Sequence, residues 1–375
     1  TVRKYENSEM PRSLTGSHAI AEDEQLVIDT SKLIGEQIFG FNLITDKSSS
    51  YSNAKDIEIS SFDETLFTIK NGNTIVPNQN GKYGTGVVII RDTDPTRNFV
   101  GIIRVQVKPK DAVATPMVSA KQSSTVALKA DGTVWTWGQN TYGQLGNGVS
   151  NGTVVYPEKI DSLSDIIKIA AAGQTAVALK TDGTVWTWGR NDNGQLGNGT
   201  TVSSNVPVQV LKGEQNQGNA DKTYLENIVA IAAGGLNDEK IFVVALDSNG
   251  NVYGFGSNEY RQLKIANDAS YNTPVVSPAV NAVDVVAGRG ATVYTLTSNG
   301  LVYALGKNYA YEYGTGGTSG SVYTLVPLDN RAMAIGAGNQ NGIAVTYSLD
   351  ASSKPSTKTY AWGNNAYYAI SPNNT

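Results

Sequence analysis

Cysteine is absent from the 375 residues, so the chain offers neither a disulfide framework nor a thiolate for a metal site or a nucleophile. Histidine occurs once, at His18, within a polar N-terminal stretch. A Ser nucleophile needs a base within reach, so a hydrolytic triad is close to excluded. The nucleotide-binding pattern G-x-x-x-x-G-K is also missing, because the Gly-rich GTGGTSG at 314–320 has no Lys. We expect a protein that is not an enzyme.

Charge and long apolar runs are also scarce. Charged residues make up 17% of the chain, the net charge is −4, and Lys and Arg form no dense cluster that could neutralise a row of phosphates. Nucleic acid is therefore not an expected partner. A membrane-spanning helix needs about 18 consecutive apolar residues, and no such run occurs, so membrane insertion is not expected. The 39 glycines and 40% hydrophobic residues are typical of a packed, turn-rich β protein.

Metal-ligand candidates are few. Asp92 and Asp94 in RDTDPTRN could supply oxygen ligands to Ca²⁺, but such a site needs about six ligands and only two are found there. An Asp-Pro turn is the favoured alternative. We therefore expect no metal and no cofactor.

A repeated motif dominates the rest of the chain. VALKADGTVWTWGQNTYGQLGNG at 126–148 recurs as VALKTDGTVWTWGRNDNGQLGNG at 177–199. The Gly that closes each aromatic strand marks five copies, spaced 51, 67, 50 and 57 residues apart, at Gly138, Gly189, Gly256, Gly306 and Gly363. Internal repeats of this length indicate a stacked architecture.

Each of four copies contains an Asp-Gly or Asn-Gly pair between short alternating apolar runs. This pattern predicts a two-residue hairpin turn with both residues at positive φ. In that register Leu128 faces Trp135 and Val126 faces Trp137, which gives each hairpin one bulky and one small face. The predicted turn residues are Asp131, Gly132, Asp182, Gly183, Asn249, Gly250, Asn299 and Gly300.

A sheet with one bulky and one small face buries both faces only by stacking on copies of itself, as the blades of a propeller do. Aromatic residues at the bulky positions are accordingly predicted to form the core between blades, although a ligand platform is the alternative for the paired Trp. The predicted core aromatics are Trp135, Trp137, Trp186, Trp188, Tyr253, Phe255, Tyr303 and Trp362. An Asn follows each closing Gly by two residues, and an apolar plug comes five residues later.

The pattern VALKxDGTVWTWGxNxxGQLGNG resembles the repeat of the regulator of chromosome condensation family, over roughly 116–375. The resemblance implies a β-propeller of four-stranded blades, here at about 116–160, 161–227, 228–280, 281–330 and 331–375. Family propellers usually close with about seven blades, whereas five copies are found. Blades are missing from the chain, another segment or subunit completes the ring, or closure is atypical.

The residues before the array do not repeat. Short strands at sandwich spacing within 24–110 resemble a bacterial immunoglobulin-like module. The predicted fold is therefore all-β, an immunoglobulin-like sandwich followed by a propeller at 111–375, joined near 109–116. Residues 1–23 are predicted to be a flexible arm, with ordering on a neighbouring subunit as the alternative.

Tyrosines crowd the loops of the later copies, and Tyr is favoured in recognition surfaces because it offers large rigid area with a polar end. Plugging gaps left by the lost Gly-Gln-Leu tail is the alternative. The predicted partner-binding residues are Tyr260, Tyr309, Tyr311, Tyr313, Tyr367 and Tyr368. An insertion at 211–227 adds 16 residues between the second and third copies, and such insertions map to loops on one face.

These observations favour a non-catalytic protein-binding or structural module. We expect it on a bacterial cell surface, an extracellular fibre or, alternatively, a phage virion, with a protein partner or neighbouring subunits. The alternatives are a guanine-nucleotide exchange factor for a small GTPase, which is the best-known activity of the family that the repeat resembles, and a protein that binds or acts on surface carbohydrate.

Overall fold

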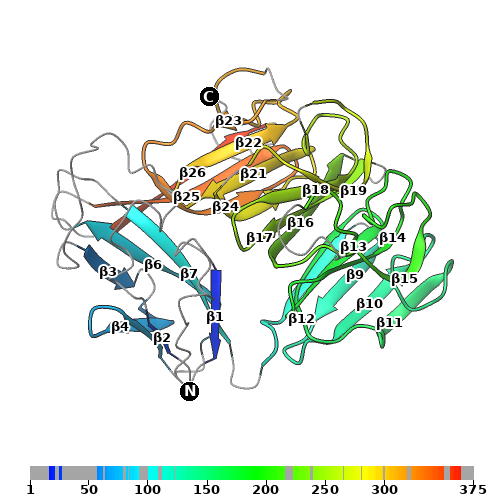
Figure 1. Ribbon diagram of the computed structural model, residues 1–375, viewed down its shortest axis with the longest axis horizontal. Helices are drawn as coiled ribbons and strands as arrows, with labels where there is room; N and C mark the ends of the chain where they lie inside the picture. The colour runs from blue at the N-terminus through cyan, green and yellow to red at the C-terminus, as the bar shows by residue number, and fades with distance from the viewer. Residues whose placement is uncertain are drawn as a thin grey trace.

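The computed structural model describes residues 17–21, 25–27, 57–61, 64–78, 82, 84–92, 100–108, 112–121, 123–215, 223–236, 240–264, 266–279, 281–298, 300–318, 322–349 and 355–364. Within these ranges the regular elements are all β-strands, β1 to β26 (Figure 1). The expectation of an all-β protein is confirmed.

Two small sheets form the N-terminal part. One has the order β1 (Ser17–Ala21), β7 (Val100–Lys108), β6 (Gly84–Asp92) and β3 (Ile57–Ser61), and the other the order β2 (Leu26–Val27), β5 (Thr74–Pro77) and β4 (Phe67–Lys70). The ring of Phe67, fully buried, lies so close to Gly86 that a Cβ there would be 2.6 Å from it, so the two sheets contact each other at this point. Whether they form an immunoglobulin-like sandwich stays a prediction.

The boundary predicted for the N-terminal arm is wrong. Strand β1 lies inside residues 1–23, yet it pairs in parallel with β7 from Ser17 opposite Arg104 to Ala21 opposite Lys108. An edge strand presents a row of unpaired backbone groups, and here β1 occupies that edge of β7. Residues 1–16 lie outside the described part of the chain.

Five antiparallel sheets, called blades 1 to 5, follow in chain order. Blade 1 comprises β8 (Met117–Lys121), β9 (Ser124–Leu128), β10 (Val134–Gln139) and β11 (Thr153–Lys159). Blade 2 comprises β12 (Ile166–Ala172), β13 (Thr175–Lys180), β14 (Val185–Gly189) and β15 (Ser204–Gln209). Blade 3 comprises β16 (Ile228–Leu236), β17 (Lys240–Asp247), β18 (Val252–Gly256) and β19 (Tyr271–Val276).

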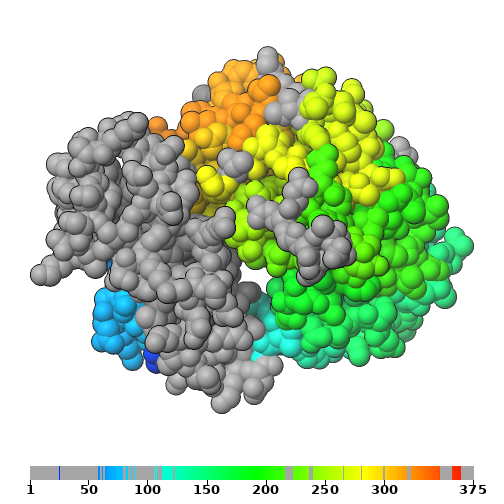
Figure 2. Space-filling view, in the orientation of Figure 1, coloured from blue at the N-terminus to red at the C-terminus, as the bar shows by residue number. Residues whose placement is uncertain are grey.

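Blade 4 comprises β20 (Ala282–Ala287), β21 (Thr292–Thr297), β22 (Val302–Gly306) and β23 (Thr324–Leu325). Blade 5 comprises β24 (Arg331–Ala337), β25 (Asn341–Leu349) and β26 (Pro355–Gly363). The first strands of consecutive blades, β8, β12, β16, β20 and β24, contact one another in that order. Figure 1 shows the blades as an arc, with the N-terminal strands on its open side, and Figure 2 shows side chains filling the space between neighbouring blades.

The predicted hairpin register is wrong by one residue. Trp135 pairs with Ala127 and Thr136 with Val126, because the turn has three residues rather than two. The amide of Gly132 donates to the carbonyl of Lys129 at 3.0 Å, and Gly132 takes a φ of +78°. A three-residue loop of this kind places its Gly in the left-handed region and adds a bulge. Aliphatic side chains therefore share one face, and Trp and Ala share the other.

Neighbouring blades still stack through unlike faces in the observed register. Val126, Leu128 and Val134 of blade 1 pack on Ala178 and Trp188 of blade 2, so an aliphatic face meets an aromatic and alanine face. The same pairing of faces joins blades 2 and 3 and, with Ala and Tyr in place of some partners, the later blades. Each interface is a continuous buried apolar layer, which is the main stabilising contribution to such an array.

Candidate protein-recognition rim

Buried asparagines build the loops at one rim of the array. The side-chain oxygens of Asn140, Asn191, Asn258 and Asn308, all fully buried, accept hydrogen bonds from the amides of Leu145, Leu196, Leu263 and Tyr313 at 2.8–3.1 Å. Their amide groups donate to later loop carbonyls, such as Val149 for Asn140 at 3.0 Å and Gly317 for Asn308 at 3.1 Å. These Asn therefore hold each rim loop in one shape.

The rim loops of blades 1 and 2 are covered by the outer strand of the next blade. Asn205 in β15 exchanges two hydrogen bonds with Gly148, both at 2.9 Å. Gly143 lies so close that a Cβ there would be 2.5 Å from the Cα of Asn205. Asn272 in β19 covers the loop of Gly194 in the same way. Only Gly fits at these two positions.

The rim loops of blades 3 and 4 differ at this position. Arg261 and Tyr311 stand where blades 1 and 2 have Gly, and they keep left-handed backbones with φ of +58° and +63°. That conformation costs a residue with a Cβ about 1 to 2 kcal/mol. Both side chains are exposed, and Tyr309 beside them is 67% exposed. The later loops thus present large side chains to solvent.

Two tyrosines and a lysine meet between blades 3 and 4. The rings of Tyr260 and Tyr309 pack edge to face with their centroids 5.9 Å apart. The ammonium of Lys307 lies 5.5 Å from both centroids, within range of a cation–π interaction. Burial, helped by the charge of Glu259, raises the pKa of Tyr260. Tyr260, Lys307, Tyr309 and Tyr311 are called the tyrosine rim below.

Two of the tyrosines in the later copies fall elsewhere. Tyr313 is buried, with its hydroxyl donating to the carbonyl of Gly306 at 2.8 Å, so the prediction of partner binding is wrong for this residue: it plugs the blade as Leu145 does in blade 1. Tyr323 does not belong to the tyrosine rim, because its ring stacks on that of Tyr303 with the two centroids 4.6 Å apart. Burial raises the pKa of Tyr323 to about 12. Tyr367 and Tyr368 lie outside the described residues.

The aromatics predicted to form the core divide into two groups. Trp188, Tyr253, Phe255 and Trp362 are buried, whereas Trp135, Trp137, Trp186 and Tyr303 are half-buried. Trp188 and Trp362 donate their indole N–H groups to the carbonyls of Gln144 and Glu312 in the preceding blade, at 3.0 and 2.8 Å. Trp135 and Trp137 lie on blade 1, which has no blade before it within the described residues.

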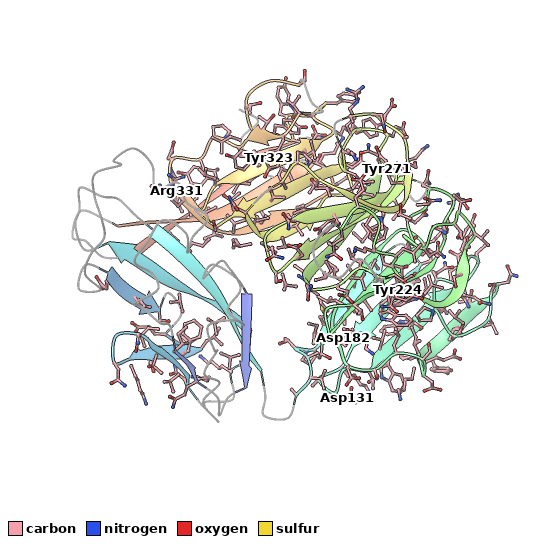
Figure 3. The ribbon with its side chains drawn as sticks, in the orientation of Figure 1. Asp131, Asp182, Tyr224, Tyr271, Tyr323 and Arg331 are labelled. Carbon is pink, nitrogen blue, oxygen red and sulfur yellow. The ribbon has the colours of Figure 1, made fainter. Side chains whose placement is uncertain are left out.

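The acidic turn residues are structural. The carboxylate of Asp131 accepts hydrogen bonds from the hydroxyl and amide of Thr133 at 2.6 and 3.0 Å, and these bonds lower its pKa. Burial alone would raise the pKa of Asp182, but equivalent bonds from Thr184 more than offset it, so the pKa is lowered. Figure 3 shows both aspartates at the ends of their hairpins.

The described residues hold no cluster of acidic or histidine side chains suited to a metal ion.

The hairpin of blade 3 depends on a residue that sequence reasoning missed. Asp247, which is 1% exposed, accepts hydrogen bonds from the amides of Asn249 and Asn251, both at 2.9 Å, and from the hydroxyl of Tyr253 at 3.1 Å. The signal in the sequence was an acid at the end of the apolar run IFVVAL.

Among the predicted turn residues of blades 3 and 4, Gly250 and Gly300 have φ of +83° and +74°, whereas Asn299 lies outside the described residues.

The described ends of the 211–227 insertion lie against blade 3. The carboxylate of Glu214 contacts the ammonium of Lys264 at 2.7 Å and accepts from the amide of Val276 at 2.9 Å. Burial would raise the pKa of Glu214, but these two contacts lower it overall. Gln215, almost fully buried, bonds both backbone groups of Glu226. The insertion therefore starts and ends at the boundary of blades 2 and 3.

Comparison with known proteins identifies the repeats. Residues 131–179, 182–236 and 249–294 match the family described as Regulator of chromosome condensation (RCC1) repeat. Human WBSCR16 shares the fold, with a TM-score of 0.51 and 18% identity over 71% of this chain and 70% of that one. Prp20p from Saccharomyces cerevisiae follows at 0.50 and 17%, over 72% and 68%. The chain therefore carries RCC1 repeats in an RCC1-like propeller fold.

Curated relatives are much longer proteins. Human "E3 ubiquitin-protein ligase HERC2" is 28% identical over 272 residues, which are 69% of this chain and 5% of the relative. Human "Probable E3 ubiquitin-protein ligase HERC3" is 31% identical over 208 residues, 54% of this chain and 18% of the relative. The chain thus spans a small part of each, in the repeat region.

The expectation that the protein is not an enzyme is corrected by these relatives. It rested on the missing Cys and on the single His, but the proteins that match the repeats are named ubiquitin ligases. A propeller repeat says nothing of the chemistry of the whole chain that carries it.

Among the described residues, no helix is long and apolar enough to cross a membrane.

Proposed function

We propose that the repeat array is a protein-recognition platform and that the tyrosine rim of blades 3 and 4 is its contact surface. The observation that carries this proposal is the contrast between the loops. Those of blades 1 and 2 have a Gly covered by Asn205 or Asn272, whereas those of blades 3 and 4 have a strained, exposed Arg261 or Tyr311. Residues that break a local rule in this way are expected at functional sites.

The chemistry of the tyrosine rim suits a protein segment. Tyr309 and Tyr311 are 67% and 51% exposed, and aromatic anchors of this kind supply a large share of binding energy in protein interfaces. Lys307 places a cation beside two of the rings, and the exposed Arg261 adds a second cation in the rim loop of blade 3. A partner segment with apolar side chains and at least one carboxylate would complement both features.

A second role is compatible with the same surface. HERC2 and HERC3 match this chain in its repeats alone, so the array would supply recognition within a larger chain that performs the chemistry. Prp20p, whose described binding properties concern Gsp1p and histones, gives a fold precedent for protein binding. Exchange of guanine nucleotides and binding of carbohydrate stay alternatives. Location on a cell surface or a phage particle stays a prediction.

The test is a peptide selection followed by matched variants. A random peptide library displayed on phage is selected on the purified protein, and the Kd of each enriched peptide is measured by calorimetry. We expect the double variant Tyr309→Ala, Tyr311→Ala to weaken binding at least about tenfold, or 1.4 kcal/mol. The control is Tyr156→Ala in β11, where Tyr156 is 79% exposed. Peptides that bind the double variant as tightly as the unchanged protein would contradict the proposal.

A further inference from the structure

The first blade has a face that no other described blade covers. In blades 2 and 5 the Trp before the closing Gly is buried, and its indole N–H donates to a carbonyl of the preceding blade. Trp137 holds this position in blade 1, where it is half-buried and has no acceptor of this kind among the described residues. The surface that receives a preceding blade in the rest of the array is therefore open here.

This open face of blade 1 is apolar. Val118 in β8 pairs with Ala127 in β9, and Ala127 pairs with Trp135 in β10, so the three side chains form one row across the sheet. Val118 is 65% exposed, whereas Ala127 and Trp135 are half-buried. Trp137 lies in the next row, beside Thr125. Blade 2 presents the corresponding row of Ala178 and Trp186 to blade 1.

The last blade has the opposite open face. Ser124 pairs with Gly138 in blade 1, as Asn341 pairs with Gly363 in blade 5, so Ile343 occupies the register position of Val126. Ile343 is 44% exposed, and Ala361 opposite it is exposed as well. In blade 1 the same position packs against blade 2. Blade 5 therefore ends the described array with Ile343 and Ala361 exposed on its aliphatic face.

We propose that these two open faces bind each other between copies, so that blade 5 of one molecule stacks on blade 1 of the next. The two faces are the two halves of the interface that joins consecutive blades within the chain, so the proposed contact continues an established interface. Within one molecule they lie at the two ends of the arc (Figure 1). The contact is heterologous and builds rings or filaments of copies.

Sedimentation velocity and mass photometry test the proposal. Over about 1 to 100 μM, a range that reveals micromolar contacts, we expect the mean mass of the unchanged protein to rise with concentration. Val118→Glu and Ile343→Glu each place a charge on one open face, at a position already exposed, so both variants should fold. Each variant alone should stay a monomer.

Mixing the two variants gives the decisive measurement. Val118→Glu keeps an intact blade 5 face and Ile343→Glu keeps an intact blade 1 face, so together they should form a one-to-one dimer and nothing larger. Val155→Glu is the matched control, because Val155 lies in the outer strand β11 and is 74% exposed, and this variant should associate normally. A monomeric unchanged protein overturns the proposal. So does a mixture without dimer, or association that Val155→Glu abolishes.

Discussion

Replacing Trp188 by Ala removes the largest fully buried side chain of the array. The indole fills the space under Gly146, where a Cβ would lie 2.8 Å from it, and its N–H donates to the carbonyl of Gln144 at 3.0 Å. Deleting a buried Trp costs about 3 to 5 kcal/mol through lost burial and the cavity that remains. The carbonyl left without its donor adds about 1 kcal/mol or more. We expect a total loss of about 4 kcal/mol or more.

Trp137→Ala is the matched control, because Trp137 occupies the same position of the same motif in blade 1. It is half-buried, and no blade lies before it within the described part of the chain. We expect this change to cost about 1 to 2 kcal/mol, from partial burial alone. A third variant, Trp188→Phe, keeps most of the apolar area and loses the N–H donor, so it should fall between the two.

Urea unfolding followed by circular dichroism measures these differences as shifts of the transition midpoint at constant slope. The concentration is kept low enough that the protein is monomeric, since association would stabilise the folded state. A loss for Trp137→Ala as large as that for Trp188→Ala would refute the reasoning. In that case the position would be destabilised for a reason common to all blades, and contact with a preceding blade would not explain the burial.

Three further changes follow from the structure. Glu312→Gln should stabilise the protein by about 1 kcal/mol or more in urea unfolding. Glu312 is fully buried, its Oε1 has no hydrogen-bond partner among the described residues, and blades 1 to 3 have Gln at this position. An unchanged midpoint of urea unfolding would contradict this prediction. Gly189→Ala should destabilise the protein more than Gly148→Ala, although both glycines have positive φ. A Cβ at position 189 would lie 2.2 Å from the carbonyl oxygen of Gln174, whereas a Cβ at position 148 would meet no described atom within 4 Å. Equal thermal midpoints of the two variants would argue against the close approach at Gly189. The lowered pKa values of Asp131 and Asp182 contribute stability that is present above the ordinary pKa of 3.8 and is lost as the pH falls through the lower folded values. The double variant Asp131→Asn, Asp182→Asn should therefore flatten the pH dependence of the free energy of unfolding below about pH 4. An unchanged pH dependence in the double variant would show that these two carboxylates do not contribute to acid unfolding.

The repeat architecture could be predicted because its signals are local. The Asp-Gly pairs, the closing Gly and the alternation of apolar residues lie within 23 residues of each other at 126–148, and each specifies a hairpin or a strand end. The side chains facing each neighbour could not be predicted as well. An Asp-Gly pair fits a two-residue or a three-residue turn, and the choice depends on bonds from Thr133 to Asp131. A slip of one residue moves every side chain to the other face.

The candidate site shows a similar limit. The repeat register places Tyr313 at the position of Leu145, so its burial could be expected from the spacing alone. The exposure of Tyr309 could not be predicted in this way, because it depends on which side chains the neighbouring blade supplies. The covering of Gly143 by Asn205 was equally hidden, since the two residues lie 62 positions apart and their contact is set by the packing of blades.

Degeneration of the repeat and exposure of the rim are therefore linked. Gly143 and Gly194 are required because a Cβ at either position would lie 2.5 Å from the Cα of Asn205 or Asn272, so a larger residue there would force the covering strand away. Tyr311 shows that the blade still forms when the residue is large, with a left-handed backbone that Gly would adopt without strain. A loop freed from its neighbour can carry aromatic and cationic side chains without weakening the buried layers between blades. The proposed recognition surface thus falls in the two copies whose loops have lost this Gly, while Leu263 and Tyr313 stay buried as the plugs of their blades.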